Sequence, residues 1–236
     1  MKKLLTQYDL VILAAGDIPN NNITINLLLN AKNLVVCDGA ANSFNKLIEN
    51  IKLNFNTKGS CLPQLKAIVG DGDSIEESIK NQYTHIFHRF KQQDDNDLTK
   101  ATTFALKNLS LPINPNVCYL GATGKREDHT LANIALLLYY YKHLKIKPVM
   151  VSDFGWFTPA NGTNTFLSFP HQQVSIFQIG CSILESKGLK WKLYPFDELW
   201  QGTLNEALGN EFYINGNSYY VVYQTHKPKT SASKDL

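Results

Sequence analysis

The sequence predicts an α/β fold with a parallel sheet for the first part of the chain and an all-β fold for the second part. Short apolar runs alternate with helix-like segments as far as about residue 145. These runs are continuously apolar, as expected for strands of a parallel sheet that is covered on both faces. Beyond Pro148 the helical periodicity fades, and short alternating segments separated by turn signals replace it.

The first part is expected to contain alternating strands and helices. The predicted strands are Leu10–Ala14, Leu34–Cys37, Leu65–Val69, Thr84–Phe87 and Val117–Leu120. The predicted helices lie near Ile23–Ala31, Ala40–Glu49, Asp97–Leu109 and Asp128–Tyr141. The third helix has the clearest start, because Asn96 can cap it and the charge of Asp97 favours its N-terminal end. Apolar stripes are predicted through Leu98, Ala101, Ala105 and Leu109, and through Leu131, Ala135 and Leu138.

The second part is predicted to form an antiparallel β-sandwich or barrel. Its candidate strands are Thr165–Phe169, Gln173–Ile179, Phe212–Ile214 and Tyr219–Tyr223. Turns are expected at Asn161-Gly162 and Asn215-Gly216-Asn217. The expected domains are residues 1–146 and 147–226, followed by a disordered tail at 227–236.

Composition narrows the class of protein. Hydrophobic residues make up 44% and charged residues 18% of the 236, which is typical of a folded domain. The formal charge is only +3, without a run of Lys and Arg interleaved with aromatics, so nucleic acid is not an expected partner. The sequence has neither a Cys-x-x-Cys pair nor an apolar stretch of about 20 residues, and the run Leu10–Ala15 is too short for a signal peptide. We therefore expect no membrane span and a cytoplasmic location.

Acidic residues follow two of the predicted strands. Asp38 follows Leu34–Cys37, and Asp71 and Asp73 follow the strand that ends at Val69. In open α/β sheets, ligands bind beyond the carboxyl ends of the strands. Two carboxylates at i and i+2 repel each other unless a cation lies between them, and Mg²⁺ typically takes one or two carboxylates together with substrate phosphates. The alternative is a polar surface turn.

A second acidic group consists of Asp94, Asp95 and Asp97, for which helix capping is the alternative role. A third feature is the segment Gly121–His129, which links a predicted strand to a helix. Backbone N–H groups at such a helix start can bind phosphate oxygens, and Arg126 can add two parallel hydrogen bonds. The alternative is a basic loop with a charged helix cap. Because these features lie on one side of one predicted sheet, together they indicate metal-assisted phosphoryl-type transfer.

The motifs resemble those of the thiamine pyrophosphokinase family, in the same order and at similar spacing. The segments that carry the resemblance are Cys37–Asn42, Gly70–Ser74, Asp94–Ala101, Gly121–Asn133, Gly188–Trp191 and Gly209–Phe212. The resemblance implies a Rossmann-like, parallel-sheet nucleotide-binding domain followed by an all-β sandwich. It also implies transfer of pyrophosphate from ATP to the hydroxyl of thiamine, which gives thiamine diphosphate and AMP, with Mg²⁺ and in a homodimer with active sites between subunits.

The resemblance also implies roles for individual residues. Asp71, Asp73 and Asp97 fall on the Mg²⁺-ATP positions, with Asp94 as a further metal ligand, and Asp128 falls near the transferring phosphates. The implied ATP contacts are Asp38, Gly39, Asn42, Thr123, Gly124, Arg126 and His129. The implied thiamine contacts are Trp191 and Asn210. The proton of the thiamine hydroxyl would pass to Asp71 or Asp128.

The chain departs from the family pattern at four positions. Gly72 stands where a bulkier residue is usual, Asn96 where Thr is common, Lys125 where Gly is common and Gly209 where Ser is common. Two alternative functions remain open: a diphosphokinase for another alcohol, such as a hydroxymethylpterin, and a non-catalytic nucleotide or thiamine sensor. The full set of Asp71, Asp73, Asp97 and Arg126 argues against a sensor.

Overall fold

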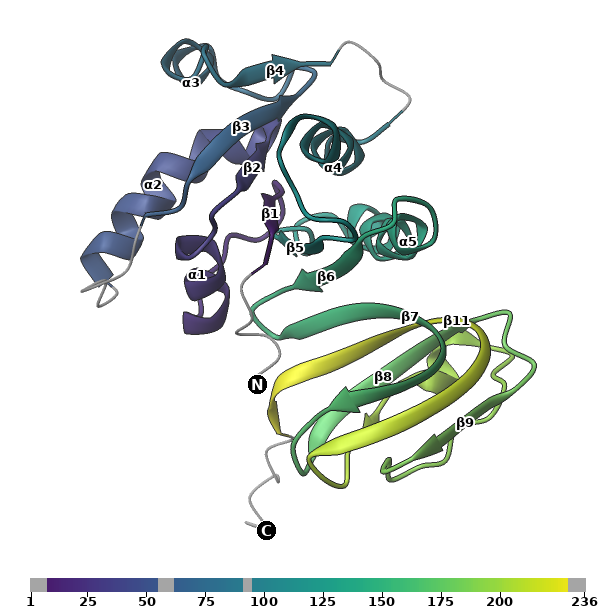
Figure 1. The fold of residues 1–236 in the computed structure, drawn as a ribbon. Helices are drawn as coiled ribbons and strands as arrows, with labels where there is room; N and C mark the ends of the chain where they lie inside the picture. Colours follow the sequence, from purple (N-terminus) through teal and green to yellow (C-terminus); the bar gives the residue numbers. More distant parts are fainter. Residues whose placement is uncertain (1–7, 55–61, 91–94, 229–236) are drawn as a thin grey trace. The chain divides into compact units, whose positions relative to one another are not determined.

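A computed structural model describes residues 8–54, 62–90 and 95–228 of the chain (Figure 1). The chain divides into two compact units, one ending at Asp153 and the other beginning at Phe154. The expected boundary after residue 146 differs from this division, because Lys147–Val151 is a further strand of the first sheet. None of the described helices combines the length and the apolar character needed to cross a membrane.

The first unit contains a parallel sheet with the strand order β6-β5-β1-β2-β3-β4. Its strands are β1 (Leu10–Leu13), β2 (Leu34–Cys37), β3 (Leu65–Gly70), β4 (Phe87–Arg89), β5 (Asn116–Leu120) and β6 (Lys147–Val151). Every residue of β1 and β2 is buried, which explains why these strands are continuously apolar.

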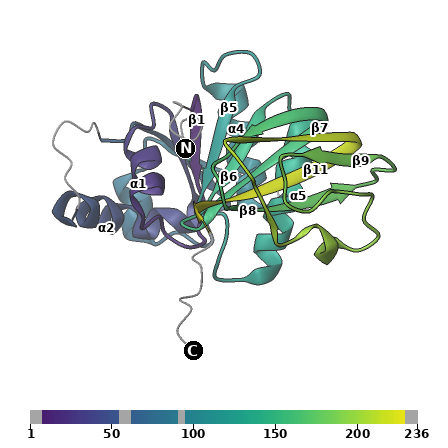
Figure 2. The same ribbon diagram turned by 90° about the horizontal axis from the view of Figure 1, so that it is seen from below.

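Helices connect these strands. They are α1 (Asn22–Leu29), α2 (Asp38–Asn54), α3 (Glu77–Gln82), α4 (Asp97–Asn108) and α5 (Glu127–His143). Figure 1 shows α1 and α2 on one face of the sheet and α4 and α5 on the other, and Figure 2 shows the same unit after a quarter turn. Asn96 caps α4 as expected, because its side-chain oxygen accepts a hydrogen bond from the backbone N–H of Thr99.

The first unit differs from the expectations in several places. The fourth strand is Phe87–Arg89 rather than Thr84–Phe87, and α3 and β6 were not expected at all. Of the stripe predicted for α5, Leu138 is buried as expected, but Leu131 is 70% exposed and Ala135 is also exposed. The other buried residues of the helix are Leu137 and Tyr140. Since α5 is apolar around most of its circumference, its sequence does not reveal which side faces the sheet.

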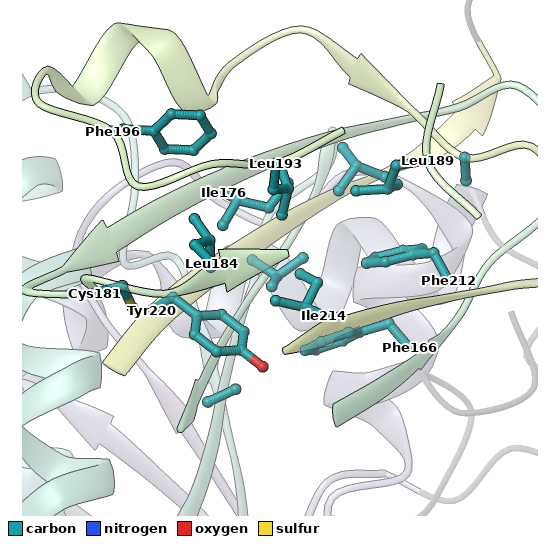
Figure 3. Close-up of a cluster of buried hydrophobic side chains, with 14 residues drawn as sticks. Phe166, Ile176, Cys181, Leu184, Leu189, Leu193, Phe196, Phe212, Ile214 and Tyr220 are labelled. Atoms are coloured by element: carbon teal, nitrogen blue, oxygen red, sulfur yellow. The ribbon is translucent and has the colours of Figure 1, made fainter. Parts of the chain in front are cut away.

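The second unit is an antiparallel β-structure. Its strands are β7 (Gly155–Leu167), β8 (Gln172–Ile179), β9 (Leu184–Lys187), β10 (Asn205–Glu206) and β11 (Glu211–Pro228), with a 3₁₀ turn at Leu199–Gly202. The first part of β11 pairs with β9 and its second part with β8. Both parts of β11 also pair with β7. A buried cluster that includes Phe166, Phe212 and Tyr220 forms the core (Figure 3).

The two turns expected in this unit are not chain reversals. Asn161-Gly162 lies inside β7, and Asn215-Gly216-Asn217 lies inside β11, where the pairing with β7 shifts register. Such an irregularity bends a strand without reversing it, which lets one strand pair with different neighbours along its length. Lys227 and Pro228 of the expected tail belong to β11, and residues 229–236 lie outside the described part of the chain.

Candidate active site

A cavity of about 560 Å³ opens at the carboxyl ends of the first unit's strands. Ala14 follows β1, Cys37 ends β2, Asp71 follows β3 and Gly121 follows β5, and all four line the cavity. Its other charged lining residues are Asp95, Asp97, Lys100, Lys125 and Arg126. The sheet thus brings both signs of charge together where a doubly wound sheet binds its ligands.

The loop that carries Asp71 is held in place by α2. Asp38, at the start of α2, is fully buried, and its Oδ2 accepts a hydrogen bond of 2.7 Å from the backbone N–H of Gly72. The side chain of Asn42 donates to the carbonyl of Ser74 at 2.7 Å and accepts from the N–H of Glu76 at 2.8 Å. A Cβ at Gly70 would collide with the side chain of Asp38, so glycine is required there. Asp38 and Asn42 therefore position the loop that follows β3.

The burial of Asp38 raises the pKa of its carboxyl group, and the nearby charges of Asp97 and Asp71 raise it further against the opposing hydrogen bond from Gly72. Gly39, the next residue of α2, packs against Ala15: a Cβ at Gly39 would lie 3.3 Å from the Cβ of Ala15. The predicted ATP contacts Asp38, Gly39 and Asn42 are not among the described residues that line the cavity.

The central feature of the cavity is a buried lysine between two carboxylates. The Nζ of Lys100 lies 3.2 Å from Oδ2 of Asp71 and 3.3 Å from Oδ1 of Asp97. The Lys100 side chain is only 6% exposed, whereas those of Asp71 and Asp97 are 25% and 33% exposed. Burial lowers the pKa of Lys100, but its hydrogen bonds to the two carboxylates outweigh this effect and raise the pKa above its ordinary value. The ammonium is therefore charged and links the loop after β3 to the start of α4.

The pKa of Asp71 is lowered, first by the hydrogen bond from the backbone N–H of Asp73 and further by Lys100. Sequence reasoning did not single out Lys100. The available signal was its position three residues after Asp97 on α4, a spacing that brings a lysine and an aspartate together on one face of a helix.

Asp73, another predicted metal ligand, has a different partner. The exposed carboxylate of Asp73 is 3.7 Å from the guanidinium of Arg89, whose Nε also donates to the carbonyl of Asp71 at 2.6 Å. Asp73 and Asp128 are not among the described residues that line the cavity, and Asp94 lies outside the described residues. Within the described ranges, no group of three or more His, Cys, Asp or Glu side chains is arranged so that it could hold a metal ion.

The loop between β5 and α5 forms another wall of the cavity. Its residues Gly121, Gly124 and Lys125 all have positive φ, at 63°, 82° and 58°. The carbonyls of Gly121 and Thr123 accept hydrogen bonds of 2.7 and 2.8 Å from the N–H groups of Gly16 and Asp17. A Cβ at Gly124 would collide with the carboxylate of Asp17. The loop after β5 is thus fastened to the loop after β1.

Arg126 precedes α5 and is held by Asp128. Its Nε and Nη2 donate to the two carboxylate oxygens of Asp128 at 3.1 and 2.6 Å, and both side chains are exposed. The hydrogen bonds from Arg126 lower the pKa of Asp128. Arg126 and His129 line the cavity, as does Asn133, which donates to the carbonyl of Ala122 at 2.8 Å. The geometry fixes the orientation of a guanidinium beside the cavity.

The second unit has a separate cavity of about 470 Å³. Trp191 lines it and is half exposed, and the Nζ of Lys190 lies 4.7 Å from the centre of its ring. Asn210 is exposed and is not among the described residues that line this cavity; its carbonyl accepts a hydrogen bond of 2.8 Å from the N–H of Ser168. Trp191 and Asn210 therefore do not both line this cavity.

Comparison with known proteins adds independent evidence. Residues 24–149 match the profile described as thiamin pyrophosphokinase, catalytic domain, and residues 155–223 match its substrate-binding domain. The chain belongs to the thiamin pyrophosphokinase family. The first match alone spans more than half of the chain. It includes the described residues that line the first cavity, apart from Ala14, Ala15 and Gly16.

Individual members of the thiamin pyrophosphokinase family are similar over parts of the sequence and over most of the fold. Thiamine pyrophosphokinase 3 from rice (Oryza sativa subsp. japonica) is 38% identical over 76 residues, which are 30% of this chain and 28% of the rice protein. Rice thiamine pyrophosphokinase 1 is 36% identical over 92 residues, 36% of this chain and 34% of that protein. The matched segments thus span about a third of these relatives.

Solved structures of the family share the fold at low sequence identity. The yeast enzyme superposes with a TM-score of 0.74 at 16% identity, covering 95% of this chain and 89% of that one. The Candida albicans enzyme gives 0.71 at 19% identity, covering 92% and 89%, and the Bacillus subtilis enzyme gives 0.68 at 18%, covering 92% and 99%. A mixed α/β fold with a parallel sheet and a β-rich C-terminal region is therefore common to these proteins and this chain.

Proposed function

We propose that this protein transfers the pyrophosphoryl group of ATP to the hydroxyl of thiamine, which yields thiamine diphosphate and AMP. The observation that carries this proposal is the cavity beyond the strand ends, where Asp71 and Asp97 converge on the Lys100 ammonium beside the loop after β5. Anionic and cationic groups arranged in this way suit a substrate that binds as a metal–phosphate complex.

The carboxylates of Asp71 and Asp97 fit a divalent cation. They already lie on either side of a positive charge, and Mg²⁺ needs only one or two carboxylates because substrate phosphates and water supply the remaining oxygens. Bound Mg²⁺ would neutralise phosphate charge. Asp73, two residues from Asp71 on the same loop, and Asp94 stay predictions as additional ligands.

The remaining side chains would bind and orient the substrate. Arg126 would hold phosphate oxygens, and Asp128 would keep its guanidinium in position through the paired hydrogen bonds. His129, Thr123 and Gly124 would lie along the same phosphate-binding loop, while Asp38 with Gly39 and Asn42 would fix the Asp71 loop from behind. Most of the acceleration would come from this positioning and from electrostatic stabilisation of the transferring group.

We further propose that the first unit is a Rossmann-like ATP-binding domain. The second unit would be a β-sandwich that binds thiamine through Trp191 and Asn210. We also propose a cytoplasmic homodimer with active sites between subunits. The exposed apolar side chains of Leu131 and Tyr139 on α5, 70% and 49% exposed, support an interface with a second copy.

The test is to incubate the purified protein with ATP, Mg²⁺ and thiamine and to separate the products by chromatography. We expect AMP and thiamine diphosphate in equal amounts. Formation of ADP, or an absence of reaction, would exclude the proposed activity. Replacing thiamine with a hydroxymethylpterin distinguishes the alternative alcohol, and calorimetric binding of thiamine without turnover would identify a sensor.

A further inference from the structure

The three cationic residues that line the first cavity differ in how their charge is balanced. Lys100 is paired with two carboxylates, and Arg126 makes two hydrogen bonds to Asp128. Lys125 has no acidic partner within 4 Å among the residues that the structure describes; its Nζ donates a hydrogen bond of 2.6 Å to the backbone carbonyl of Ala15. A neutral carbonyl does not cancel the ammonium charge. Lys125 therefore offers the cavity an ammonium that makes no ion pair with the described residues.

The backbone of Lys125 is held in an unfavourable conformation. Its φ of 58° is in the left-handed region, which residues with a Cβ seldom adopt, and it follows directly on Gly124 with φ 82°. A glycine would adopt this conformation without strain. Residues kept in such conformations are concentrated at functional sites, where the surrounding structure enforces them. Here the hydrogen bonds between the loops after β1 and β5 do so.

The position of the ammonium gives this strained residue a role. Ala15 lies two residues beyond the end of β1 and, like Lys125, lines the cavity, so the lysine side chain links the loop after β5 to the loop after β1. A phosphate oxygen can replace the Ala15 carbonyl as the acceptor, and the hydrogen bond then gains the attraction between opposite charges.

We propose that Lys125 binds the triphosphate of the nucleotide and sets the affinity of this chain for it, by exchanging the carbonyl of Ala15 for a phosphate oxygen. This proposal rests on the proposed function, because it takes a nucleoside triphosphate to be the ligand of the first cavity. Lys125 would thus add a phosphate contact to the one that Arg126 supplies.

The test measures ATP binding by calorimetry in the presence of Mg²⁺ and without thiamine. Lys125→Met retains most of the side chain but removes the charge, and Lys125→Gly removes the charge and the backbone strain together. Both are expected to weaken ATP binding about tenfold or more, the usual effect of losing a hydrogen bond to a charged group. Lys125→Arg should restore binding to near the wild-type value. The urea midpoint of Lys125→Gly should be at or above that of the wild type, because relief of strain offsets the greater flexibility of glycine.

Lys145 provides a matched control. It is an exposed lysine beyond the end of α5 with a φ of 51°, and it is not among the described residues that line the cavity. Lys145→Gly removes the same charge from the same backbone conformation and should leave ATP binding unchanged. ATP binding within twofold of wild type in both Lys125→Met and Lys125→Gly would overturn the proposal, as would equal weakening by Lys145→Gly.

The same protein samples separate this proposal from the proposed function. If the wild type binds ATP but forms no AMP with thiamine, the proposed function fails while weaker binding by the Lys125 variants still supports the phosphate contact. If the wild type forms AMP and the Lys125 variants bind ATP normally, only the role of Lys125 fails. If the wild type does not bind ATP, both are overturned.

Discussion

Replacing Lys100 with methionine tests the central feature of the cavity. The substitution keeps the length of the side chain but removes the ammonium that lies 3.2 and 3.3 Å from the carboxylates of Asp71 and Asp97. Removing one partner of a fully buried ion pair destabilises a protein by about 3–5 kcal/mol. Here the carboxylates are a quarter and a third exposed and regain water, so we expect a loss of about 2 kcal/mol in the free energy of unfolding.

The two carboxylates would then repel each other, and added Mg²⁺ should relieve this repulsion. We therefore expect Mg²⁺ to raise the urea midpoint of Lys100→Met more than that of the wild type, because the variant has lost the competing ammonium. Equilibrium urea unfolding with and without Mg²⁺ measures both effects. Turnover, assayed as AMP formation, should fall about tenfold or more, because the phosphates of the substrate are no longer held in position.

Lys107→Met is the matched control, because Lys107 is exposed on the last turn of the same helix. It should change the free energy of unfolding by no more than about 0.5 kcal/mol. If Lys100→Met unfolds at the same urea concentration as Lys107→Met, and Mg²⁺ stabilises the two equally, then the ammonium does not hold the carboxylates together and the reasoning is wrong.

Other variants test the scaffold and the metal site. Asp153→Ala should destabilise the protein by about 1–3 kcal/mol in urea unfolding, because the carboxylate accepts a 2.5 Å hydrogen bond from the hydroxyl of Thr24 and further bonds from two backbone N–H groups; an unchanged midpoint would contradict this. Gly124→Ala should lower both the urea midpoint and the ATP affinity, because its Cβ would collide with Asp17 and its φ is 82°; wild-type behaviour in calorimetry would show that the loop adapts freely. Asp73→Asn should lose most turnover and keep its circular dichroism spectrum, and near-normal AMP formation would remove Asp73 from the metal site.

Much of the first unit could be predicted because its signals are local. The buried strands β1 and β2 are continuously apolar, and Asn96 with Asp97 marks the start of α4 at the correct residue. The strand β4 has only three residues, of which two are exposed, so its apolar signal is weak and its predicted position was wrong. In the second unit, the polar residues of Asn215-Gly216-Asn217 have the composition of a turn, yet cross-strand pairing keeps them within β11.

Two features of the site could be predicted without the structure: acidic residues follow the ends of buried strands, and a glycine-containing loop precedes a helix with Arg126 at its start. Both are predictable because apolar runs and helix caps depend on neighbours along the chain. Which side chains meet could not be predicted in this way and depends on the folded chain. Lys100 reaches Asp71, 29 residues earlier, and Asp38 turns inward to hold Gly72, because parallel strands bring distant segments to the same edge of the sheet. Pairings of this kind depend on the order of strands in space, which periodicity along one segment does not encode.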